Sequence, residues 1–525
     1  MRFRLSLYFH TIRHLTLRQV YFRLYYFVKN RIYPLKPYIP RVESKVVGIN
    51  PKVPFSLKQG IYLGVDGFCF LNISHQFSEG IDWEFDGYGK LWTYHLNYFD
   101  YLLDESCSQD EAFRLMHEYR HSEPGLRVGK MPYPVSLRIF NWVKVMIRFG
   151  RFDAQDLGFL RCDLAQLYSN VEYHVLGNHL LENALALVFG GMAVNEKRYL
   201  DKGMAILNKQ LKVQLLDDGG HFERSPMYQQ ILLERMLDCI NLSENMDDGQ
   251  KLRILLEPFV LKMFHWLVRM TFSNGDIAMV NDATHGMSMT TRQLLDYGLQ
   301  LGFQLSSRSP QMLGSGYRRY DRGSFECIVD SGDVGPDYLL AHAHSDTLSF
   351  CLYVDGSPLV LDTGTSTYQS DAIRQRERST SAHNTVCIDG REQSDAWGAF
   401  RMAHRAHARI LEEGDWHMKA THDGYDRIGA RHTRSFRLEQ DRLIIEDIVR
   451  GGKMHEAFLH FAPGLEPYIS EEGAVKVGSV FIRISGANSL HIETYDQAKA
   501  FNRRIRASRL RISFTGHLTT VCSKS

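Results

Sequence analysis

The 525-residue chain lacks several features that would place it in a specialised class. Its eight cysteines are spread from Cys69 to Cys522 without a CxxC pair, which excludes a zinc ribbon or a CxxC redox motif and gives no sign of a disulfide framework. No apolar run approaches the roughly 20 residues that span a bilayer. Low-complexity tracts and fixed-period repeats are also missing. What remains is an ordinary globular chain, long enough for roughly two to four domains.

The overall charge is nearly balanced. Lys and Arg number 62 against 60 Asp and Glu, which gives a formal charge of +2. This balance argues against a nucleic-acid-binding protein, because such proteins concentrate positive charge on one face. A hydrophobic content of 44% and a charged content of 23% are instead typical of a soluble globular protein.

The amino-terminal segment departs from this balance. Residues 1–42 hold nine Lys or Arg and no acidic residue, with aromatic and aliphatic residues between them, as in RQVYFRLYYFVKNRIY. The segment has neither the uninterrupted apolar core nor the cleavage site of a secretory signal. We predict a basic amphipathic segment over residues 1–45, which either lies on an anionic membrane surface or docks on the protein with its arginines in solvent. The expected location is cytoplasmic or peripheral to the inner membrane.

Hydrophobic periodicity divides the rest of the chain in two. From about residue 95 to 305, apolar residues recur at i, i+3, i+4 and i+7 in segments of helix length, such as HLLENALALVFGGMAV. From about residue 315, short alternating runs separated by Gly turns are typical of an antiparallel sheet or sandwich. We predict a helical domain over residues 46–312 and a β-sandwich domain over residues 313–525.

A cluster of metal-ligating residue types lies early in the β half. His342, His344 and Asp346 alternate in AHAHSDTLSF, so a strand beginning at His342 would place all three on one sheet face. Asp362 ends the next strand, PLVLD, after a hairpin turn of the Asp-Gly type, and His383 follows in STSAHNTV. Two imidazoles and a carboxylate on neighbouring strands make a plausible zinc site. The alternative is a set of polar strand residues with one satisfied histidine.

The helical half contains a polar cluster of its own. In GNHLLENALAL, Asn178, His179 and Glu182 share one helix face near its amino end. Some fifty residues later, in GGHFERSPMYQQ, Pro226 suits a first helical turn and Tyr228 lies where that helix begins. The alternative is structural: Asn178 would cap its helix, and the Tyr228 hydroxyl would bond to a backbone carbonyl.

Together these motifs resemble the heparinase II/III-type polysaccharide lyases, a group that includes heparin, heparan sulfate and alginate lyases. The similarity covers most of the chain and extends through LWTYHLNYFDYL, MPYPVSLRIFNW, GNHLLENALAL, GGHFERSPMY, AHAHSDTLSF and STSAHNTV. It is greatest to members found with bacterial capsule and exopolysaccharide genes. It implies an incomplete α/α toroid followed by an antiparallel β-sandwich, with the substrate cleft between them. The usual secretion signal is missing, so the family's periplasmic or cell-envelope setting is an alternative location here.

The resemblance also implies roles for individual residues. The family's Asn-His pair falls on Asn178 and His179, and the Glu three positions after that His falls on Glu182. Its catalytic Tyr falls on Tyr228, and the first His of its His-x-His motif falls on His342. The expected substrate is an acidic, uronic-acid-containing polysaccharide, cleaved in capsule or exopolysaccharide metabolism.

One zinc ion is expected as cofactor on the same grounds. The family's metal ligands fall on His344, Asp362 and His383, the last at a shorter separation than is usual in larger members. The implied zinc is structural: it would hold the segment that presents His342 to the cleft, rather than activate a water molecule.

The chemistry of such a lyase explains these residue types. The enzyme removes the proton at C5 of a uronate and expels the oxygen at C4, leaving an unsaturated sugar. Asn178 and a protonated or donating His179 would stabilise charge on the carboxylate as it becomes an enolate. Tyr228 would be the base, provided that a positive group such as Arg224 lowers its pKa from about 10. The leaving oxygen would receive its proton from Tyr228 or from His342.

Further substrate contacts and two other functions are also considered. We predict that the polymer is bound by Glu182, Arg224, Tyr133, Arg138 and Arg378. One rival function is a toroid glycoside hydrolase with paired carboxylates, such as Glu182 and Glu223. The other is a non-catalytic carbohydrate-binding assembly protein, anchored by its basic amino terminus.

Overall fold

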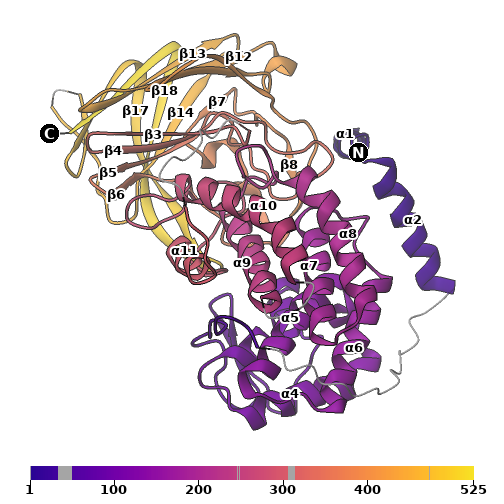
Figure 1. Ribbon diagram of the computed structural model, residues 1–525. Helices are drawn as coiled ribbons and strands as arrows, with labels where there is room; N and C mark the ends of the chain where they lie inside the picture. Colours follow the sequence, from indigo (N-terminus) through magenta and orange to yellow (C-terminus); the bar gives the residue numbers. More distant parts are fainter. Residues whose placement is uncertain are drawn as a thin grey trace.

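The computed structural model describes residues 2–32, 50–244, 246, 249–305, 314–471 and 473–524. It shows a helical half followed by an antiparallel β half, the order that periodicity predicts (Figure 1). The last long helix of the first half ends at Gln300, and the first strand of the second half begins at Tyr317. The predicted boundary between residues 312 and 313 falls at the edge of residues 306–313, outside the described residues.

The helical half is a set of packed helices preceded by a small hairpin. Its elements are β1 (Gly67–Phe70), β2 (Ile73–Gln76), α3 (Lys90–Tyr98), α4 (Gln109–Ser122), α5 (Pro132–Phe149), α6 (Ala154–Ser169), α7 (Gly177–Ala193), α8 (Lys197–Gln214), α9 (Pro226–Ser243), α10 (Gly249–Arg269) and α11 (Thr291–Gln300). Helix α7 is central, and every one of its residues except His179 is buried. An apolar sequence on all sides is what such a central position requires.

The β half contains two sheets that share a core. The smaller sheet has the order β3-β4-β5-β6, with β3 (Tyr317–Arg322), β4 (Phe325–Asp330), β5 (Phe350–Val354) and β6 (Ser357–Val360). The larger sheet has the order β10-β11-β12-β13-β18-β17-β16-β15, and β14 pairs with both β18 and β7. Apolar residues of both sheets form one cluster, in which Phe350 and Phe436 lie with ring centroids 5.6 Å apart. This is the predicted sandwich.

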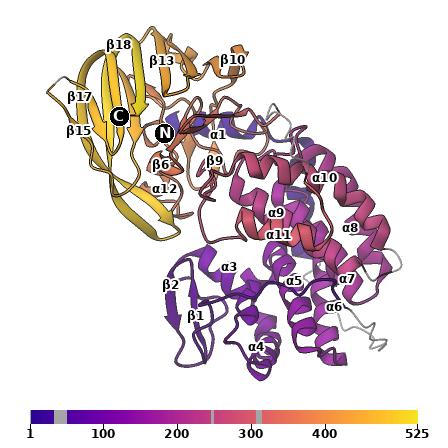
Figure 2. The same ribbon diagram turned by 60° about the vertical axis from the view of Figure 1, so that its left-hand side comes forward.

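The bounds of the remaining elements of the β half are as follows: β7 (Val386–Ile388), β8 (Ala396–Trp397), β9 (Arg401–Met402), β10 (Ala408–Gly414), β11 (His417–His422), β12 (Arg431–Leu438), β13 (Arg442–Arg450), β14 (His455–His460), β15 (Tyr468–Ile469), β16 (Val475–Val477), β17 (Val480–Ala500), β18 (Arg503–Lys524) and the short helix α12 (Ala372–Glu377). The β17–β18 hairpin extends toward β1 and β2 of the helical half (Figure 2). At its tip, Asn502 donates a hydrogen bond to the Leu71 carbonyl (3.0 Å), and Asn72 donates one to the Phe501 carbonyl (2.9 Å). The hairpin therefore joins the two halves.

One local prediction is wrong and one is confirmed. Residues 341–349 do not form a strand, since β5 begins only at Phe350, so His342, His344 and Asp346 do not share a sheet face. In this loop both histidines turn toward the same carboxylate, that of Asp282. The Asp-Gly hairpin turn is present between β5 and β6, where Asp355 and Gly356 have positive φ angles of 51° and 69°.

The amino-terminal segment forms two helices, α1 (Arg2–Ile12) and α2 (Leu17–Ile32). The remainder of the predicted segment, residues 33–45, lies outside the described residues. Among the helices that are described, none combines the length and the apolar character that crossing a membrane would require.

Candidate active site

A cleft of about 850 Å³ lies between the two halves. It is lined by residues of α3, α5, α7 and α9 from the helical half and by loops of the β half. Five of the predicted site residues line it: Tyr133, Asn178, His179, Tyr228 and His342. The four residues predicted to be catalytic therefore share one cavity, although His342 lies 114 positions beyond Tyr228 in the sequence.

The closest grouping in the cleft joins α9 to the 341–349 loop. The ring centroids of Tyr228 and His342 are 4.1 Å apart, and the Asn178 side-chain amide lies 3.5 Å from His342 Nε2. Tyr228 is placed by the start of α9, where Ser225 caps the helix and accepts a hydrogen bond from the Tyr228 backbone. A phenol, an imidazole and an amide thus meet where a sugar ring can enter.

Asp282 orients the imidazole of His342. His342 Nδ1 lies 2.8 Å from Asp282 Oδ2, and because an ionised carboxylate only accepts, Nδ1 carries the proton and Nε2 faces the cleft. Arg374 and His344 also bond to this fully buried carboxylate. Burial alone would raise the pKa of Asp282, but Arg374 and the two histidines hold it well below its ordinary value.

Glu223 fixes Asn178 at the start of α7. Its carboxylate accepts hydrogen bonds from the Asn178 backbone N–H (3.0 Å) and from the side-chain amide (2.7 Å). The preceding Gly177 has a φ of +57°, and a Cβ there would lie 2.1 Å from Glu223 Oε1, so only glycine fits. Burial works to raise the pKa of Glu223, but His221, His342 and the Asn178 hydrogen bonds lower it below its ordinary value. Asn178 Oδ1 has no partner among the described residues.

His179, the second residue of the Asn-His pair, also lines the cleft. Its side chain is 29% exposed, its ring lies 4.2 Å from that of Tyr133, and its Nδ1 lies 3.1 Å from Glu172 Oε2. Desolvation opposes the charged form, but Glu172 outweighs it and raises the pKa of His179 above its ordinary value. A protonated, donating His179 agrees with the role that the sequence suggests.

The expected effect of Arg224 on Tyr228 is wrong. Burial, the neighbouring Tyr368 and the negative Asp282 raise the pKa of Tyr228 well above its ordinary value, which favours the protonated phenol. Its hydroxyl lies 3.1 Å from the Tyr368 hydroxyl. Arg224 does not line the cleft; it interacts electrostatically with two buried acids of the β half, Asp330 and Asp346.

Three other predicted substrate contacts are also corrected. Arg138 is fully buried and donates two hydrogen bonds to Asp163, at 2.8 and 2.7 Å. Arg378 is fully buried and donates to backbone carbonyls, among them that of Ala343. Glu182 is fully buried, with Arg235 3.7 Å away. Each side chain is turned into the core, a direction that helical or loop position in the sequence does not reveal.

The predicted metal ligands lie beside this site, and their chemistry can be compared with that of zinc. His344 Nε2 bonds to Asp282 and His383 Nδ1 bonds to Asp362, at 2.9 and 2.7 Å. The other ring nitrogens, His344 Nδ1 and His383 Nε2, are buried and have no hydrogen-bond partner among the described residues, and the same is true of Asp346 Oδ2. Within the described parts of the chain, no three His, Cys, Asp or Glu side chains stand close enough to hold a metal ion. The donor types therefore fit zinc, but they are not gathered around one point.

Several residues of the site were missed at the sequence level. Tyr368 touches the Tyr228 hydroxyl, Asp282 and Arg374 orient His342, and Glu223 holds Asn178. Glu223 was considered only as half of a hydrolase pair. The sole local signal for Asp282 is a polar VNDAT segment between two elements, which by itself favours an ordinary loop.

Two family models match the chain: Heparinase II/III N-terminus over residues 135–300 and Heparinase II/III-like, C-terminal over residues 305–521. Heparin-sulfate lyase of Pedobacter heparinus is 21% identical over 252 residues, which are 42% of this chain and 37% of the relative. Heparin-sulfate lyase of Bacteroides stercoris is 22% identical over 249 residues, 42% of this chain and 36% of the relative. The matches thus span little more than a third of these curated relatives.

The fold itself is similar over a longer part of the chain. A crystal structure of heparinase III superposes with a TM-score of 0.67 at 16% identity, covering 95% of this chain and 88% of that one. The heparan sulfate lyase structure from Pedobacter heparinus gives a TM-score of 0.57 at 16% identity, with 96% and 88% covered. This confirms the predicted toroid followed by a sandwich. With both halves matched by its models, the chain belongs to the heparinase II/III family.

Proposed function

We propose that this protein is a polysaccharide lyase that cleaves a uronic-acid-containing polysaccharide by β-elimination. The observation that supports it most directly is the meeting of Tyr228, His342 and Asn178 in the cleft between the two halves. Elimination needs one group to take the C5 proton, another to protonate O4, and donors for the carboxylate. This grouping contains all three kinds.

Substrate binding is assigned to the Asn-His pair. The uronate carboxylate would accept hydrogen bonds from the Asn178 amide and from His179, whose raised pKa favours the donating form. Negative charge on the carboxylate grows as the enolate forms, so donors held in place before reaction stabilise the transition state more than the ground state. Glu223 and Glu172 hold these two donors in place.

Proton transfer is divided between His342 and Tyr228. We assign the base to His342, because its Nδ1–H donates a hydrogen bond to Asp282 and the unprotonated Nε2 can accept the C5 proton. Asp282 and Glu223, whose Oε2 is 3.6 Å from Nε2, would stabilise the imidazolium that forms. The protonated phenol of Tyr228 then gives its proton to O4 as the bond to C4 breaks. This reverses the sequence-based assignment of Tyr228 as base, since its pKa is raised rather than lowered.

A structural zinc ion is part of the proposal. His344, Asp362 and His383 would hold it, as expected from the family, and Asp346 lies close to the same cluster. The ion would supply a fixed cross-link between the loop of His344 and the segment of His383. His342 lies two positions from His344, so this brace would limit the movement of the base.

The cleft favours a substrate that carries carboxylates and few sulfates. Of the four Lys and Arg side chains that line it, two are already paired, Lys144 with Asp238 (2.5 Å) and Arg235 with Glu234 (3.2 Å). The other two, Lys58 and Lys90, have no ion-pair partner among the described residues. A densely sulfated chain needs more cationic contacts than this. Aromatic side chains that could pack on sugar rings also line the cleft: Tyr88, Tyr94, Tyr98, Tyr133, Tyr228, Tyr368, Phe400 and Phe501.

The rival functions predict different products. A hydrolase with Glu182 and Glu223 as its pair is disfavoured, because Glu182 does not reach the cleft. Digestion of glucuronan, alginate and heparan sulfate in heavy-oxygen water, followed by mass spectrometry, separates the cases. A lyase gives unsaturated products without the heavy oxygen; a hydrolase incorporates it at the new reducing end; a binding protein gives no products. Heavy oxygen in the products would overturn the proposal.

A role in capsule or exopolysaccharide metabolism stays a prediction.

A further inference from the structure

Helix α2 lies against the protein through a single face. Gln19 is buried and donates a hydrogen bond to the Tyr338 carbonyl (3.2 Å), the Tyr26 hydroxyl donates to the Val171 carbonyl, and Phe22 packs on Tyr173 at 4.8 Å. Positions 19, 22 and 26 follow the helical repeat, so they form one stripe. Figure 1 shows α2 running along the outside of the helical half.

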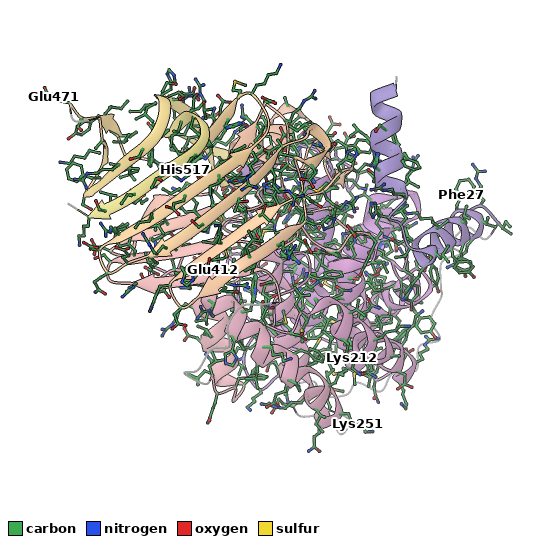
Figure 3. All side chains as sticks on the ribbon, turned by 90° about the horizontal axis from the view of Figure 1, so that it is seen from above. Phe27, Lys212, Lys251, Glu412, Glu471 and His517 are labelled. Atoms are coloured by element: carbon green, nitrogen blue, oxygen red, sulfur yellow. The ribbon has the colours of Figure 1, made fainter. Side chains whose placement is uncertain are left out.

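The opposite face of α2 is apolar and exposed. The large apolar side chains on it are between 42% and 89% exposed: Leu17, Val20, Tyr21, Leu24, Tyr25, Phe27, Val28 and Ile32. Helix α1 adds Tyr8, Phe9 and Ile12. Of the described residues, eleven exposed large apolar side chains thus lie within residues 2–32, against eighteen in the whole remainder. Phe27 projects from the edge of the molecule in Figure 3. We call these eleven residues the outer apolar face.

Packing among the described residues does not explain such a face. Water-exposed helices normally turn polar residues outward, and a contiguous exposed apolar surface of this kind marks a docking site. Both helices are held to the body on their inner sides; for α1, Trp397 donates a hydrogen bond to Thr11 Oγ1 at 3.1 Å. The outer apolar face is therefore presented on a fixed support.

The positive charge of residues 2–32 indicates what kind of surface the outer apolar face binds. Residues 2–32 contain seven Lys or Arg and no acidic residue. Beyond residue 42 the chain has 53 basic and 60 acidic residues, because nine of the 62 basic ones precede that point, so the positive charge is concentrated in this segment. Arg13, Arg23 and Arg31 are exposed, and the Arg31 guanidinium lies 4.3 Å from the Phe27 ring centre. Aromatic and aliphatic residues edged by arginines match an anionic lipid–water interface.

We propose that α1 and α2 dock the protein on the surface of an anionic lipid bilayer. The outer apolar face would enter the head-group region, and the arginines beside it would contact anionic head groups. The helices lie on the surface and do not cross it. Because α1 contacts the β half and α2 contacts both halves, at Val171 and at Tyr338, docking would also fix how the cleft is oriented on the membrane.

The test uses the full chain and co-sedimentation with vesicles. We expect binding to vesicles of phosphatidylglycerol and phosphatidylcholine, weaker binding to phosphatidylcholine alone, and a decrease with added salt, which screens the charge contribution. The double variant Leu24→Glu, Phe27→Glu should bind at least tenfold less tightly. A matched control, Ile254→Glu, Leu299→Glu, alters two side chains on α10 and α11 that are each 67% exposed, and should bind like the wild type.

Three results would overturn the proposal. The first is wild-type protein that fails to sediment with anionic vesicles. The second is equal binding by the wild type and the Leu24→Glu, Phe27→Glu variant. The third is a dimer in sedimentation velocity that this variant abolishes while vesicles are not bound, which would assign the outer apolar face to a second copy of the chain. Circular dichroism of both variants checks that the exposed substitutions leave the fold intact.

Discussion

Two parts of the molecule contain the same trio of side chains, a histidine, an aspartate and an arginine. At the domain junction His342 bonds to Asp282 (2.8 Å), which Arg374 also contacts. Within the sandwich His432 bonds to Asp447 (2.7 Å), which Arg434 contacts at 2.7 Å. The carboxylate has a pKa below its ordinary value in both, because burial is outweighed by the arginine and histidine.

The two trios differ in what the second ring nitrogen meets. In the sandwich, His432 Nδ1 lies 3.3 Å from His422, the side chain is fully buried, and burial lowers its pKa. At the junction, His342 Nε2 faces a large cleft beside Tyr228. Residue types and pairing therefore do not distinguish the trio that we propose to be catalytic from the one inside the sandwich. The difference is access to a cavity that also contains the Tyr228 phenol.

The largest expected effect is a difference in kcat between variants of His342 and His432. Tyr228→Phe and His342→Gln should each lower kcat by about 10²- to 10⁴-fold, the usual contribution of a positioned acid or base, with little change in Tm. His432→Gln should lower Tm but leave kcat per folded molecule unchanged. Steady-state rates and thermal melts of the three variants make the comparison. Equal loss of kcat in His432→Gln would remove the distinction between the trios.

Next in size is the carboxylate donor. Asn178→Ala should lower kcat by about 10²- to 10³-fold, since it removes a donor that acts on developing charge. KM should change much less than kcat, because the hydrogen bond from Asn178 strengthens as charge grows in the transition state, and His179 still binds the carboxylate in the ground state. A variant that raised KM alone would show that Asn178 binds substrate without acting on the transition state.

The structural trio should dominate stability. Arg434→Met leaves Asp447 buried without its main cation and should reduce the free energy of unfolding by about 3–5 kcal/mol. The control is Arg437→Met on the same strand, whose side chain is 60% exposed and pairs with Glu439; it should cost no more than about 1 kcal/mol. Urea melts of both variants give the two values. Similar losses of unfolding free energy in the two variants would mean that burial of the Arg434–Asp447 pair does not determine its contribution to stability.

The smallest effect concerns Glu182 and depends on pH. Burial raises its pKa to about 7, so the folded protein holds a proton that the unfolded chain releases near its ordinary value. Unfolding then becomes easier as pH rises through this window, and wild-type stability should fall between about pH 5 and pH 8. Glu182→Gln removes this titration. As pH rises, the free energy of unfolding of the variant should therefore exceed that of the wild type by an amount that grows from near zero to at most about 3 kcal/mol. Parallel pH dependences in urea melts would contradict the raised pKa.

Local features of the site were predictable from the sequence. The apolar run after GNH predicts α7 with Asn178 in its first turn, and Ser-Pro before Met-Tyr predicts the start of α9 at Pro226, with Tyr228 in its first turn. Periodicity also separates the helical half from the sandwich. These signals are local, because each depends on residues within a few helical turns or one hairpin.

Long-range pairing was not predictable in the same way. Asp282 and His342 are 60 positions apart, and the two hydroxyls of Tyr228 and Tyr368 are 140 apart, so no window of sequence contains both partners. The direction in which a side chain points was equally hard to predict from the sequence. Arg138 was expected at the cleft wall, but its helix turns it toward Asp163 in the core. The wrong pKa direction for Tyr228 follows from the same gap.

Ultraviolet absorbance during digestion of uronic-acid polymers tests the central claim most directly, because elimination creates a conjugated double bond and hydrolysis does not. Wild-type protein should produce a steady rise with glucuronan or another sparsely sulfated uronate polymer, and Tyr228→Phe and His342→Gln should each abolish it. A rise of normal rate in either variant, or chain shortening by the wild type without any rise, would contradict the account.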